Sequence, residues 1–456
     1  MKEYDVIMIG SGSGMLIVDE ALSEGLKVAL VDKGALGGTC LNVGCIPSKI
    51  LIYVADRIVE IQEAKKLGVT AEIANIDFNS IMNRMRMSVQ EGQDHMRRGI
   101  RSFRNLDFYE AEGHFIEDYM MEVGKERIRG RKIFIAAGAR PSIPPVKGID
   151  KIDYLTNESV LRLGKSPRSM VIVGGGYIAA EYGHFFAAMG TKVTILQRNI
   201  RLISEEEPEI SDLLKEKMEK RMEVYTNMEV IEVRKEGDNY IIVGRNRGTG
   251  RERSFEAEKV MIASGRTSNA DLLKVENTGV ETDERDFIKV NEYLETTKKN
   301  IWAFGDIIGK EMFRHVANRE ATVAWHNSVD EHKIKMNYHA APHAVFTYPQ
   351  IASVGLTEEQ AKKSYKILVG KAKYSDVAKG EAMMETEGFA KTIVERGSGK
   401  ILGFHIIGPE ASTLIQEVIN TMAIQGDLWS ISQGLHIHPA LPELVLRTFQ
   451  NLREPQ

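Results

Sequence analysis

The sequence predicts an α/β protein with two similar parallel-sheet domains and a C-terminal α+β domain. Two segments far apart in the chain share one pattern: a short apolar run, a glycine-rich turn, a helix and a second apolar run. They are YDVIMIGSGSG to KVALVDK and SMVIVGGGYIAAEYG to KVTILQR. Such apolar runs are typical of parallel strands that are covered on both faces. Beyond about residue 340 the pattern changes to hairpin strands and an amphipathic helix, which indicates a separate α+β domain.

The first glycine turn has nearly all the features of a dinucleotide-binding fingerprint. Gly10 and Gly12 leave room for the backbone to approach a pyrophosphate at the N-terminus of the following helix. Asp32 ends the second strand, where a ribose hydroxyl needs an acceptor. Met15 occupies the usual position of the third glycine, so we expect the close packing of helix on strand to be achieved differently.

The second glycine turn predicts a second Rossmann-like dinucleotide-binding domain. It carries Gly174, Gly176 and Ala179. Its second strand ends in Gln197 and Arg198 rather than in an acid, and Arg201 follows closely. Arginine suits a 2'-phosphate, so this end favours NADPH without excluding NADH. The alternative is that both arginines are ordinary solvated surface charges.

The only two cysteines, Cys40 and Cys45, lie five positions apart in the segment GGTCLNVGCIPSK. This spacing indicates a redox disulfide, although two structural thiols are the alternative. On a regular helix their Cα atoms would be about 8.6 Å apart, beyond the roughly 7 Å that a disulfide tolerates. We therefore expect a break in the helix at Asn42 to Gly44. Lys49 lies four residues beyond Cys45, and a nearby ammonium lowers the pKa of a thiol.

Composition gives no sign of a nucleic-acid or membrane partner. The chain has 60 basic and 64 acidic residues, a net charge of -4, and no long run of one sign. The N-terminal segment MKEYDVIMIGSGSG reaches its glycines too soon for a signal peptide or a membrane span, so we expect a cytoplasmic protein. His339 and His343 show no metal-ligand spacing with the cysteines, so we expect no metal site.

Two further segments contain candidate polar groups. In NIWAFGDII, Asp306 follows an apolar strand and could accept hydrogen bonds from a ribitol chain, with a plain strand-end turn as the alternative. In HIHPALPE, His438 has the side chain whose pKa suits proton transfer near neutral pH. Two prolines keep this segment out of a regular helix, so Glu443 can reach His438. A surface histidine is the alternative, and the role of His436 stays open.

Together these motifs resemble the flavin-dependent pyridine nucleotide-disulfide oxidoreductases, over essentially the whole chain. Within that family the segments are similar to those of dihydrolipoyl dehydrogenases and mycothione reductases. The resemblance implies a homodimer with a shared active site, with FAD at the first fingerprint and NADP or NAD at the second. It implies an FAD-binding domain at 1–148 and 266–338, an NAD(P)-binding domain at 149–265 and a dimerisation domain at 339–456.

The resemblance also implies a role for each candidate residue. Cys45 is the sulfur that faces the flavin, and Cys40 exchanges with the substrate. Lys49 pairs with Glu181 beside the flavin, and Tyr177 covers the nicotinamide pocket. His438 and Glu443 form a catalytic dyad that comes from the other subunit. Cofactor contacts are expected at Gly10, Gly12, Gly14, Asp32, Lys33, Gly38, Thr39, Gly138, Asp306, Ala317, Gly174, Gly176, Tyr177, Ala179, Arg198, Gly265 and Arg266.

The activity implied is transfer of two electrons between NAD(P)H, FAD, the Cys40–Cys45 disulfide and a small thiol or disulfide such as dihydrolipoamide. An NADPH-dependent reductase of a low-molecular-weight disulfide, like mycothione reductase, is the alternative; a non-enzymatic flavoprotein is less favoured. Gln197 and Arg198 favour the alternative, whereas the redox motif and HIHP favour the lipoamide enzyme. Mercuric and large thioredoxin reductases need a further C-terminal cysteine pair, but this chain ends LRTFQNLREPQ.

Overall fold

The computed structural model describes residues 1–455, which form two compact units. Unit 1 comprises Met1–Ser48, Met82–Ser142 and Gly265–Asn337. Unit 2 comprises Lys49–Ile81, Ile143–Ser264 and the residues from Tyr338 onward. Unit 1 is close to the predicted FAD-binding domain, except that residues 49–81, 143–148 and 338 belong to unit 2. Unit 2 contains both of the other predicted domains, so the division into three domains stays a prediction.

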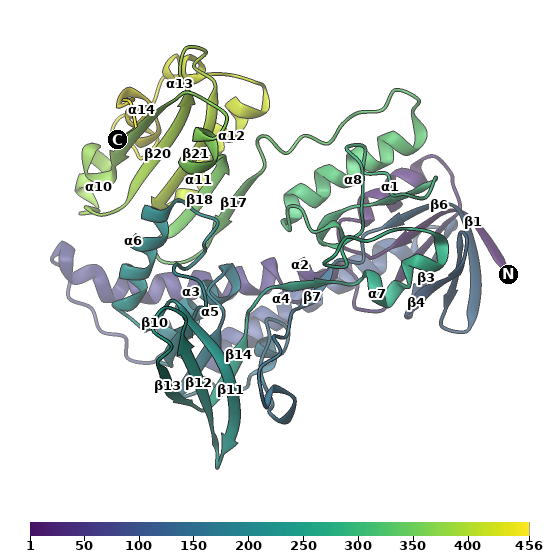
Figure 1. Ribbon diagram of the computed structural model, residues 1–456, viewed down its shortest axis with the longest axis horizontal. Coiled ribbons are helices and arrows are strands. Elements are labelled where there is room, and N and C mark those ends of the chain that lie inside the picture. Colours follow the sequence, from purple (N-terminus) through teal and green to yellow (C-terminus); the bar gives the residue numbers. More distant parts are fainter. Residues whose placement is uncertain (456) are drawn as a thin grey trace. The chain divides into compact units, whose positions relative to one another are not determined.

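Unit 1 is built on a mostly parallel sheet (Figure 1). The strand order is β3-β2-β1-β6-β5-β4, and β16 pairs with β6. Strands β1, β2, β3, β6 and β16 are parallel, whereas β4 and β5 form an antiparallel extension. The strands are β1 (Lys2–Ile9), β2 (Val28–Asp32), β3 (Leu106–Glu110), β4 (Gly113–Glu117), β5 (Met120–Val123), β6 (Glu126–Ile135) and β16 (Ile301–Ala303). Val6, Ile7 and Met8 are fully buried, as expected of a strand covered on both faces.

Helices α1 (Met15–Ser23) and α8 (Arg314–Val329) pack together in unit 1. The redox segment forms α2 (Gly38–Asn42) and the start of α3 (Cys45–Glu63), and α4 is Phe78–Arg101. A small ribbon joins β7 (Ala139–Pro141) to β15 (Arg266–Ser268), and α7 (Ala270–Leu273) follows it.

Unit 2 contains the second parallel sheet, in the order β10-β9-β8-β14. Its strands are β8 (Ser169–Val173), β9 (Lys192–Leu196), β10 (Glu223–Tyr225) and β14 (Lys259–Ile262), with helices α5 (Tyr177–Ala188) and α6 (Pro208–Glu219). An antiparallel sheet of β11 (Met228–Glu236), β12 (Asn239–Asn246) and β13 (Glu252–Ala257) follows β10 in the chain. The second predicted strand–turn–helix–strand segment is therefore confirmed.

The C-terminal part of unit 2 is the expected α+β fold. Five antiparallel strands run in the order β17-β18-β21-β20-β19. They are β17 (Pro342–Val345), β18 (Gln350–Gly355), β19 (Ile367–Lys373), β20 (Phe389–Glu395) and β21 (Ile401–Gly408). The helices are α9 (Glu358–Lys362), α10 (Ala378–Ala382), α11 (Ala411–Leu414), α12 (Gln416–Ala423), α13 (Leu428–Ser432) and α14 (Glu443–Gln450).

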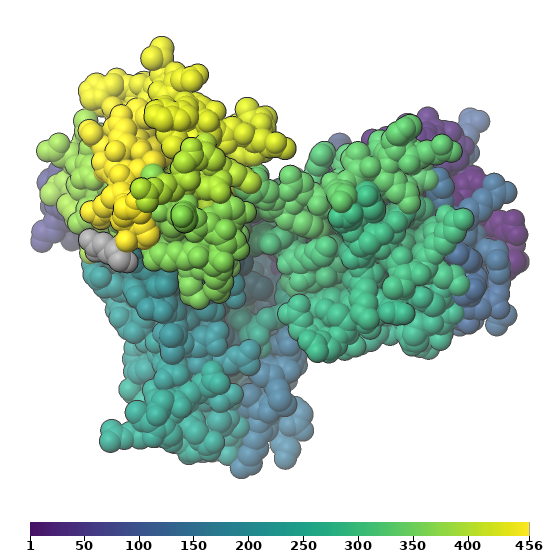
Figure 2. All heavy atoms as spheres, turned by 45° about the horizontal axis from the view of Figure 1, so that its top comes forward, coloured from purple at the N-terminus to yellow at the C-terminus, as the bar shows by residue number. Residues whose placement is uncertain are grey.

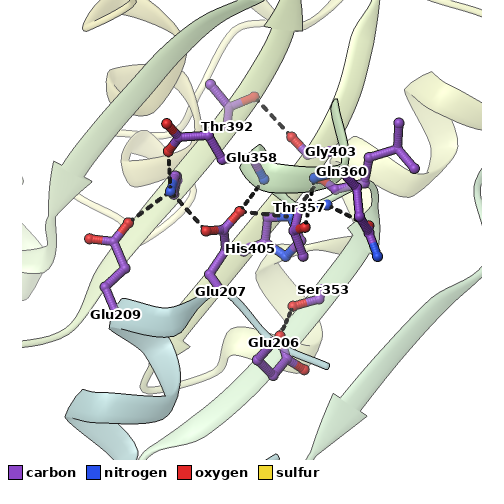
Figure 3. Close-up of polar contacts among 12 residues, drawn as sticks. Glu206, Glu207, Glu209, Ser353, Thr357, Glu358, Gln360, Thr392, Gly403 and His405 are labelled. Atoms are coloured by element: carbon purple, nitrogen blue, oxygen red, sulfur yellow. Dashed lines mark hydrogen bonds and ion pairs between the residues drawn. The ribbon is translucent and has the colours of Figure 1, made fainter. Parts of the chain in front are cut away.

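A buried ionic cluster joins the C-terminal sheet to α6 within unit 2 (Figure 3). The ammonium of Lys391 on β20 lies 2.9 Å from Glu207, 3.0 Å from Glu209 and 2.7 Å from Glu358. Lys391 and Glu207 are almost fully buried. The three carboxylates raise the pKa of Lys391 above its usual value, although its burial acts in the opposite direction. Because buried charges are stable only when they are paired, this cluster requires the C-terminal sheet and the start of α6 to stay together.

Apolar side chains are exposed on α3 and on the C-terminal segment. Tyr53 and Ile61 on α3 are exposed, as are Ile424, Trp429, Leu435 and Ile437. Figure 2 shows the C-terminal segment, in yellow, on the surface of unit 2. Within residues 1–455, the run Gly38–Leu67 alone has the length and composition to cross a membrane, with a mean hydropathy of 1.3. A core helix of a soluble protein passes the same test.

Candidate functional site

The two glycine turns repeat the same backbone geometry. Gly10 has φ of +102°, and a Cβ there would lie 2.3 Å from the carbonyl oxygen of Ala136 at the end of β6. Gly174 has φ of +123°, and its Cβ would lie 2.1 Å from the carbonyl oxygen of Ala263 after β14. Only glycine fits such a turn, so the two predicted fingerprints are alike in structure as well as in sequence.

Gly14, rather than residue 15, provides the close packing of α1 on β1. A Cβ on Gly14 would lie 2.3 Å from the carbonyl oxygen of Gly10 and 2.4 Å from the side chain of Met8. Met15 is the first residue of α1 and is only partly buried. Gly14 therefore takes the packing role of the third glycine, which the fingerprint lacks at position 15.

Ser11 organises the first turn, and sequence reasoning missed it. Its backbone N–H and its hydroxyl both donate to Oδ2 of Asp32, at 2.7 and 2.6 Å. The same hydroxyl accepts a hydrogen bond from the N–H of Gly37, at 3.0 Å. Ser11 is fully buried. Its hydrogen bonds join the first fingerprint to the redox segment. The only sequence signal was a small polar residue between two glycines.

The helix breaks between the two cysteines, as the disulfide geometry requires. Helix α2 ends at Asn42, Val43 has φ of -143° and ψ of 16°, and α3 begins at Cys45. A Cβ on Gly44 would lie 2.8 Å from the carbonyl oxygen of Thr39 and 3.3 Å from the Cα of Cys40. The chain therefore folds back onto Cys40 through the absence of a side chain at Gly44.

Asn42 contributes its side chain rather than an unusual backbone conformation. Its Nδ2 is shared among the carbonyl oxygens of Ala35, Leu36 and Gly38, at 2.9 to 3.0 Å. Its Oδ1 accepts from Nε2 of Gln93 on α4, at 2.6 Å. Asn42 is thus still helical, and the break lies at Val43 and Gly44.

The redox segment lies directly against the first glycine turn. Gly38 has φ of +60°, and its Cβ would lie 2.8 Å from the Cα of Gly12. Nη1 of Arg314, at the start of α8, lies 3.7 Å from the position of a Cβ on Gly12. A guanidinium at a glycine turn and a helix N-terminus suits a pyrophosphate. Arg314 was not predicted, because it lies far from the fingerprint in sequence.

Asp306 and Arg266 meet in unit 1. Nε of Arg266 lies 3.3 Å from Oδ2 of Asp306, and its Nη2 donates to the carbonyl oxygen of Ala139. Burial raises the pKa of Asp306, and Arg266 partly opposes the rise. Gly138 and Gly265 flank the β7–β15 ribbon, both with positive φ and open space where a Cβ would be.

A buried carboxylate supports the turn that carries Asp306. Oε2 of Glu320 on α8 accepts from the N–H of Gly305, at 2.7 Å. Ala317, one of the expected contact residues, lies 3.4 Å from the position of a Cβ on Gly305. Two other expected contact residues, Lys33 and Thr39, are exposed, and Lys33 lies 3.4 Å from Glu112. Glu320 is a further residue that no motif indicated.

Tyr177 opens α5 in the second fingerprint and stacks on a histidine. The ring centroids of Tyr177 and His343 are 5.8 Å apart, with an angle of 25° between the planes. Nε2 of His343 lies 2.6 Å from Oε1 of Glu206, and the hydroxyl of Ser353 donates to the other carboxylate oxygen, at 2.5 Å. Gly176 is the N-cap of α5, and Ala179 is fully buried.

The arginines at the end of β9 differ in their surroundings. Arg201 is engaged by Asp212, at 2.8 and 3.3 Å. Arg198 is exposed, and its carbonyl oxygen lies 3.5 Å from Nη1 of Arg247, in the β12–β13 hairpin. The guanidinium of Arg247 therefore lies next to the backbone of Arg198 at this strand end. This pairing could not be predicted, because the hairpin comes from a distant part of the sequence.

The expected pair of Lys49 and Glu181 is present in unit 2. Nζ of Lys49 donates to both carboxylate oxygens of Glu181, at 2.9 and 2.7 Å. Oε1 of Glu181 also accepts from the N–H of Phe346, at 3.0 Å. Lys49 lies 4.7 Å from the centre of the Phe346 ring. Because Glu181 is buried, these donors compensate a carboxylate that has lost its water.

His438 and Glu443 are also in contact, as expected. Nδ1 of His438 lies 2.9 Å from Oε1 of Glu443, and the N–H of Ala440 donates to the other oxygen, at 3.2 Å. The hydrogen bond from His438, aided by that of Ala440, lowers the pKa of Glu443. With Nδ1 donating, Nε2 of the exposed imidazole is left for proton transfer. His436 instead contacts Glu417, at 2.9 Å.

Within residues 1–455, no three histidine, cysteine, aspartate or glutamate side chains are grouped so that they could hold a metal ion. The cysteines lie in unit 1, whereas Lys49, Glu181, Tyr177 and the dyad lie in unit 2. The functional candidates therefore comprise a thiol pair in unit 1 and ionisable groups in unit 2.

Comparison with known families shows the family of the chain. Residues 4–321 match the pyridine nucleotide-disulphide oxidoreductase family, and residues 317–448 match its dimerisation domain. The chain belongs to this family. The chain is therefore an FAD-dependent disulfide oxidoreductase that uses NAD(P)H.

Three groups of relatives within the family match along most of the chain. Mycothione reductase of Mycobacterium tuberculosis is 36% identical over 99% of this chain and 100% of its own length. Mercuric reductase of Staphylococcus aureus is 32% identical over 93% and 77%. Dihydrolipoyl dehydrogenase of Bacillus subtilis is 31% identical over 97% and 96%. A Cu(II) complex of the HOCl-induced flavoprotein disulfide reductase RclA from Escherichia coli has a TM-score of 0.88, 26% identity and coverage of 99% of both chains.

The residues of unit 1 fit an FAD molecule. The turn at Gly10 has no room for a side chain, and Arg314 supplies a positive charge next to Gly12. Nε of Arg266 is buried with no hydrogen-bond partner, although it lies beside Asp306. A polar group of a bound cofactor would satisfy this nitrogen, because buried donors are rarely left unpaired.

Proposed function

We propose that this protein is an NADPH-dependent flavoprotein reductase of a low-molecular-weight disulfide. The contact between Gly38 and Gly12 carries the proposal, because it brings the cysteine turn against the first glycine turn. Arg198 and Arg247 favour NADPH, since guanidinium groups bind a 2'-phosphate well. The 36% identity to a mycothione reductase supports a small disulfide as the substrate.

The contacts support the cofactor-binding roles that the family resemblance implies. Gly10, Gly12 and Arg314 would hold the pyrophosphate of FAD, Asp32 its ribose, and Asp306 its ribitol chain. Bound FAD supplies the hydride transfer and the reduction of the cysteine pair. Tyr177 would cover the nicotinamide pocket, and Lys49 with Glu181 would lie beside the flavin.

The cysteines carry out two exchange steps. The thiolate of Cys40 attacks the substrate disulfide, so that a mixed disulfide forms and one substrate thiolate leaves. His438 gives that thiolate a proton. The thiolate of Cys45 then attacks the sulfur of Cys40, so that the Cys40–Cys45 disulfide forms and the second thiolate leaves. NADPH supplies the two electrons that return the pair to its dithiol form.

The active site would be shared between two copies of the chain. The match to a dimerisation domain fits a homodimer. Exposed apolar side chains on α3 and in the C-terminal segment support a surface that a second copy covers. The partner subunit's His438 would serve the cysteines of each chain. A cytoplasmic location is proposed as well, since a pair that cycles through its dithiol form suits a reducing compartment.

The second candidate is a dihydrolipoyl dehydrogenase, in which the electrons flow in the opposite direction. The HIHP segment and the 31% identity to the Bacillus subtilis enzyme favour it. Mercuric reduction is not favoured, because both cysteines of the sequence belong to the redox motif.

Steady-state rates with NADPH and NADH test the proposal. The substrates are lipoamide and the disulfides of mycothiol, glutathione and coenzyme A. We expect the highest kcat/KM with NADPH and one of the low-molecular-weight thiol disulfides. Preference for lipoamide with NADH would establish the second candidate instead. The absence of flavin bleaching by either nucleotide would contradict both.

Arg198→Ala is expected to weaken NADPH selectively. Loss of a charge-assisted contact to the 2'-phosphate should raise the KM for NADPH roughly 10- to 100-fold and leave that for NADH nearly unchanged. Arg247→Ala should act in the same direction, whereas Arg201→Ala is the matched control, because Asp212 already engages Arg201. An equal loss with both nucleotides would show that Arg198 does not contact the 2'-phosphate.

His438→Gln is expected to slow the exchange with substrate by roughly 10²- to 10⁴-fold, the usual contribution of a general acid–base group. Flavin reduction by NADPH in a stopped-flow experiment should stay near the wild-type rate, because hydride transfer does not include the proton transfer assigned to His438. His436→Gln is the matched control, since Glu417 holds its ring. If both half-reactions of His438→Gln slowed equally, the dyad would not be the proton donor.

A further inference from the structure

A buried histidine on α5 has two charged partners. Nε2 of His184 lies 2.8 Å from Oδ1 of Asp56, and its Nδ1 lies 2.8 Å from Nη1 of Arg221. A guanidinium only donates, so Nδ1 must accept and Nε2 must carry the proton that is donated to Asp56. His184 is therefore neutral and held as one tautomer. Burial has the largest effect on the pKa of His184 and lowers it, which also favours the neutral imidazole.

Asp56 and His184 form a second bridge between the helices that carry Lys49 and Glu181. Lys49 and Asp56 lie two helical turns apart on α3, and Glu181 and His184 lie one turn apart on α5. These spacings put both members of each helix on one face. Helices α3 and α5 are thus joined twice, first by Lys49–Glu181 and again by Asp56–His184.

The segment between β17 and β18 closes these contacts into a ring. The N–H of Phe346 donates to Glu181, at 3.0 Å, and Nη2 of Arg221 donates to the carbonyl oxygen of Tyr348, at 2.6 Å. The rings of His184 and Tyr348 stack with centroids 6.2 Å apart. The ring therefore runs from Lys49 through Glu181, the 346–348 segment, Arg221 and His184 to Asp56, and returns along α3. All of it lies in unit 2.

We propose that His184 is a positioning residue that fixes the spacing of α3 and α5 and so holds the Lys49–Glu181 pair in place. The inference rests on the proposed role of that pair beside the flavin. A lysine side chain has many rotamers, so its ammonium keeps one position only if the backbones on both sides are fixed. Asp56 and Arg221 act through His184, because each supplies one of its two hydrogen bonds.

Three variants separate positioning from a merely structural role. His184→Phe removes both hydrogen bonds at similar volume, and His184→Gln keeps a donor and an acceptor. Lys49→Met reports the effect of losing the pair itself. His405→Phe is the matched control, because His405 is equally buried in unit 2 but lies outside the ring. Each holoenzyme is measured for its flavin midpoint potential, its rate of flavin reduction by NADPH and its thermal midpoint.

His184→Phe should slow flavin reduction roughly 10- to 100-fold, the usual cost of a misplaced catalytic group, and shift the potential in the same direction as Lys49→Met. Lys49→Met combined with His184→Phe should be no slower than Lys49→Met alone, since coupled residues are not additive. His184→Gln should restore most of the rate, whereas His405→Phe should change only the thermal midpoint. The ¹⁵N spectrum of histidine-labelled apoprotein, assigned with His184→Phe, should show the Nε2–H tautomer.

Several results would overturn the inference. A wild-type rate and potential in His184→Phe, with Lys49→Met impaired, would contradict positioning by His184 but leave the role of the pair intact. Wild-type behaviour of Lys49→Met would contradict the role of the pair itself. If His184→Phe fails to fold, Asp56→Ala takes its place, because it removes the acceptor of Nε2 of His184 and leaves the imidazole and Arg221 unchanged. Wild-type flavin properties in that variant would also contradict the proposal.

Discussion

Cys45→Ser is expected to reduce turnover of disulfide substrates by at least about 10³-fold, because the second exchange step loses its nucleophile. The long-wavelength charge-transfer band should also be absent after reduction, since serine supplies no thiolate at the flavin. Flavin reduction by NADPH should stay near the wild-type rate. Stopped-flow spectra with a photodiode array measure the band and the rate in one experiment.

Cys40→Ser is the matched control, because it removes the other sulfur of the same turn. It should lose substrate turnover to a similar extent, but Cys45 can then no longer form a disulfide. Its thiolate should give the charge-transfer band even before reduction. A normal band in Cys45→Ser, or a band that is lost only in Cys40→Ser, would reverse the roles assigned to the two sulfurs.

The break between the cysteines was predictable because it follows from distances alone. An unbroken helix cannot close the disulfide, and Gly44 was one of the residues available for a turn. The pairs Lys49–Glu181 and His438–Glu443 were expected from the family resemblance, and both are in contact. In each case a local motif fixed one partner, and the family pattern supplied the other.

The residues that sequence reasoning missed lie close to the site only through the fold. Arg314 reaches Gly12 because α8 packs on α1, and Glu320 reaches Gly305 from the same helix. Arg247 reaches Arg198 from a hairpin. None of these side chains has a periodic or motif signal, since a long-range contact depends on topology rather than on local spacing. Ser11 is the exception, because it stands inside the fingerprint itself.

The histidine ring shows the same limit at a larger scale. Asp56 lies on α3, His184 on α5 and Arg221 in the turn after α6, and each looks like an ordinary polar residue in sequence. Only the contacts of His184 with Arg221 and Asp56 show that its tautomer is fixed. The sequence thus predicts which groups carry out the chemistry, whereas the structure identifies the groups that hold them in place.

Lys391→Met is expected to destabilise unit 2 by about 3 to 5 kcal/mol, because it leaves buried carboxylates without their counter-ion. Lys391 is buried among Glu207, Glu209 and Glu358, and a methionine of similar length fills the space without restoring the charge. Urea denaturation measures the loss of stability. Hydrogen exchange should locate it, with faster exchange in β18, β20 and β21 and little change in unit 1.

Lys371→Met provides the matched control on the neighbouring strand. Lys371 stands directly opposite Lys391 in the β19–β20 register and also contacts Glu209, but it is about one-third exposed. An exposed pair of this kind contributes at most about 1 kcal/mol, so the control should change stability little. Equal losses in the two variants would show that burial does not decide the strength of the cluster. A Lys391→Met protein as stable as wild type would contradict a stabilising role of the buried cluster.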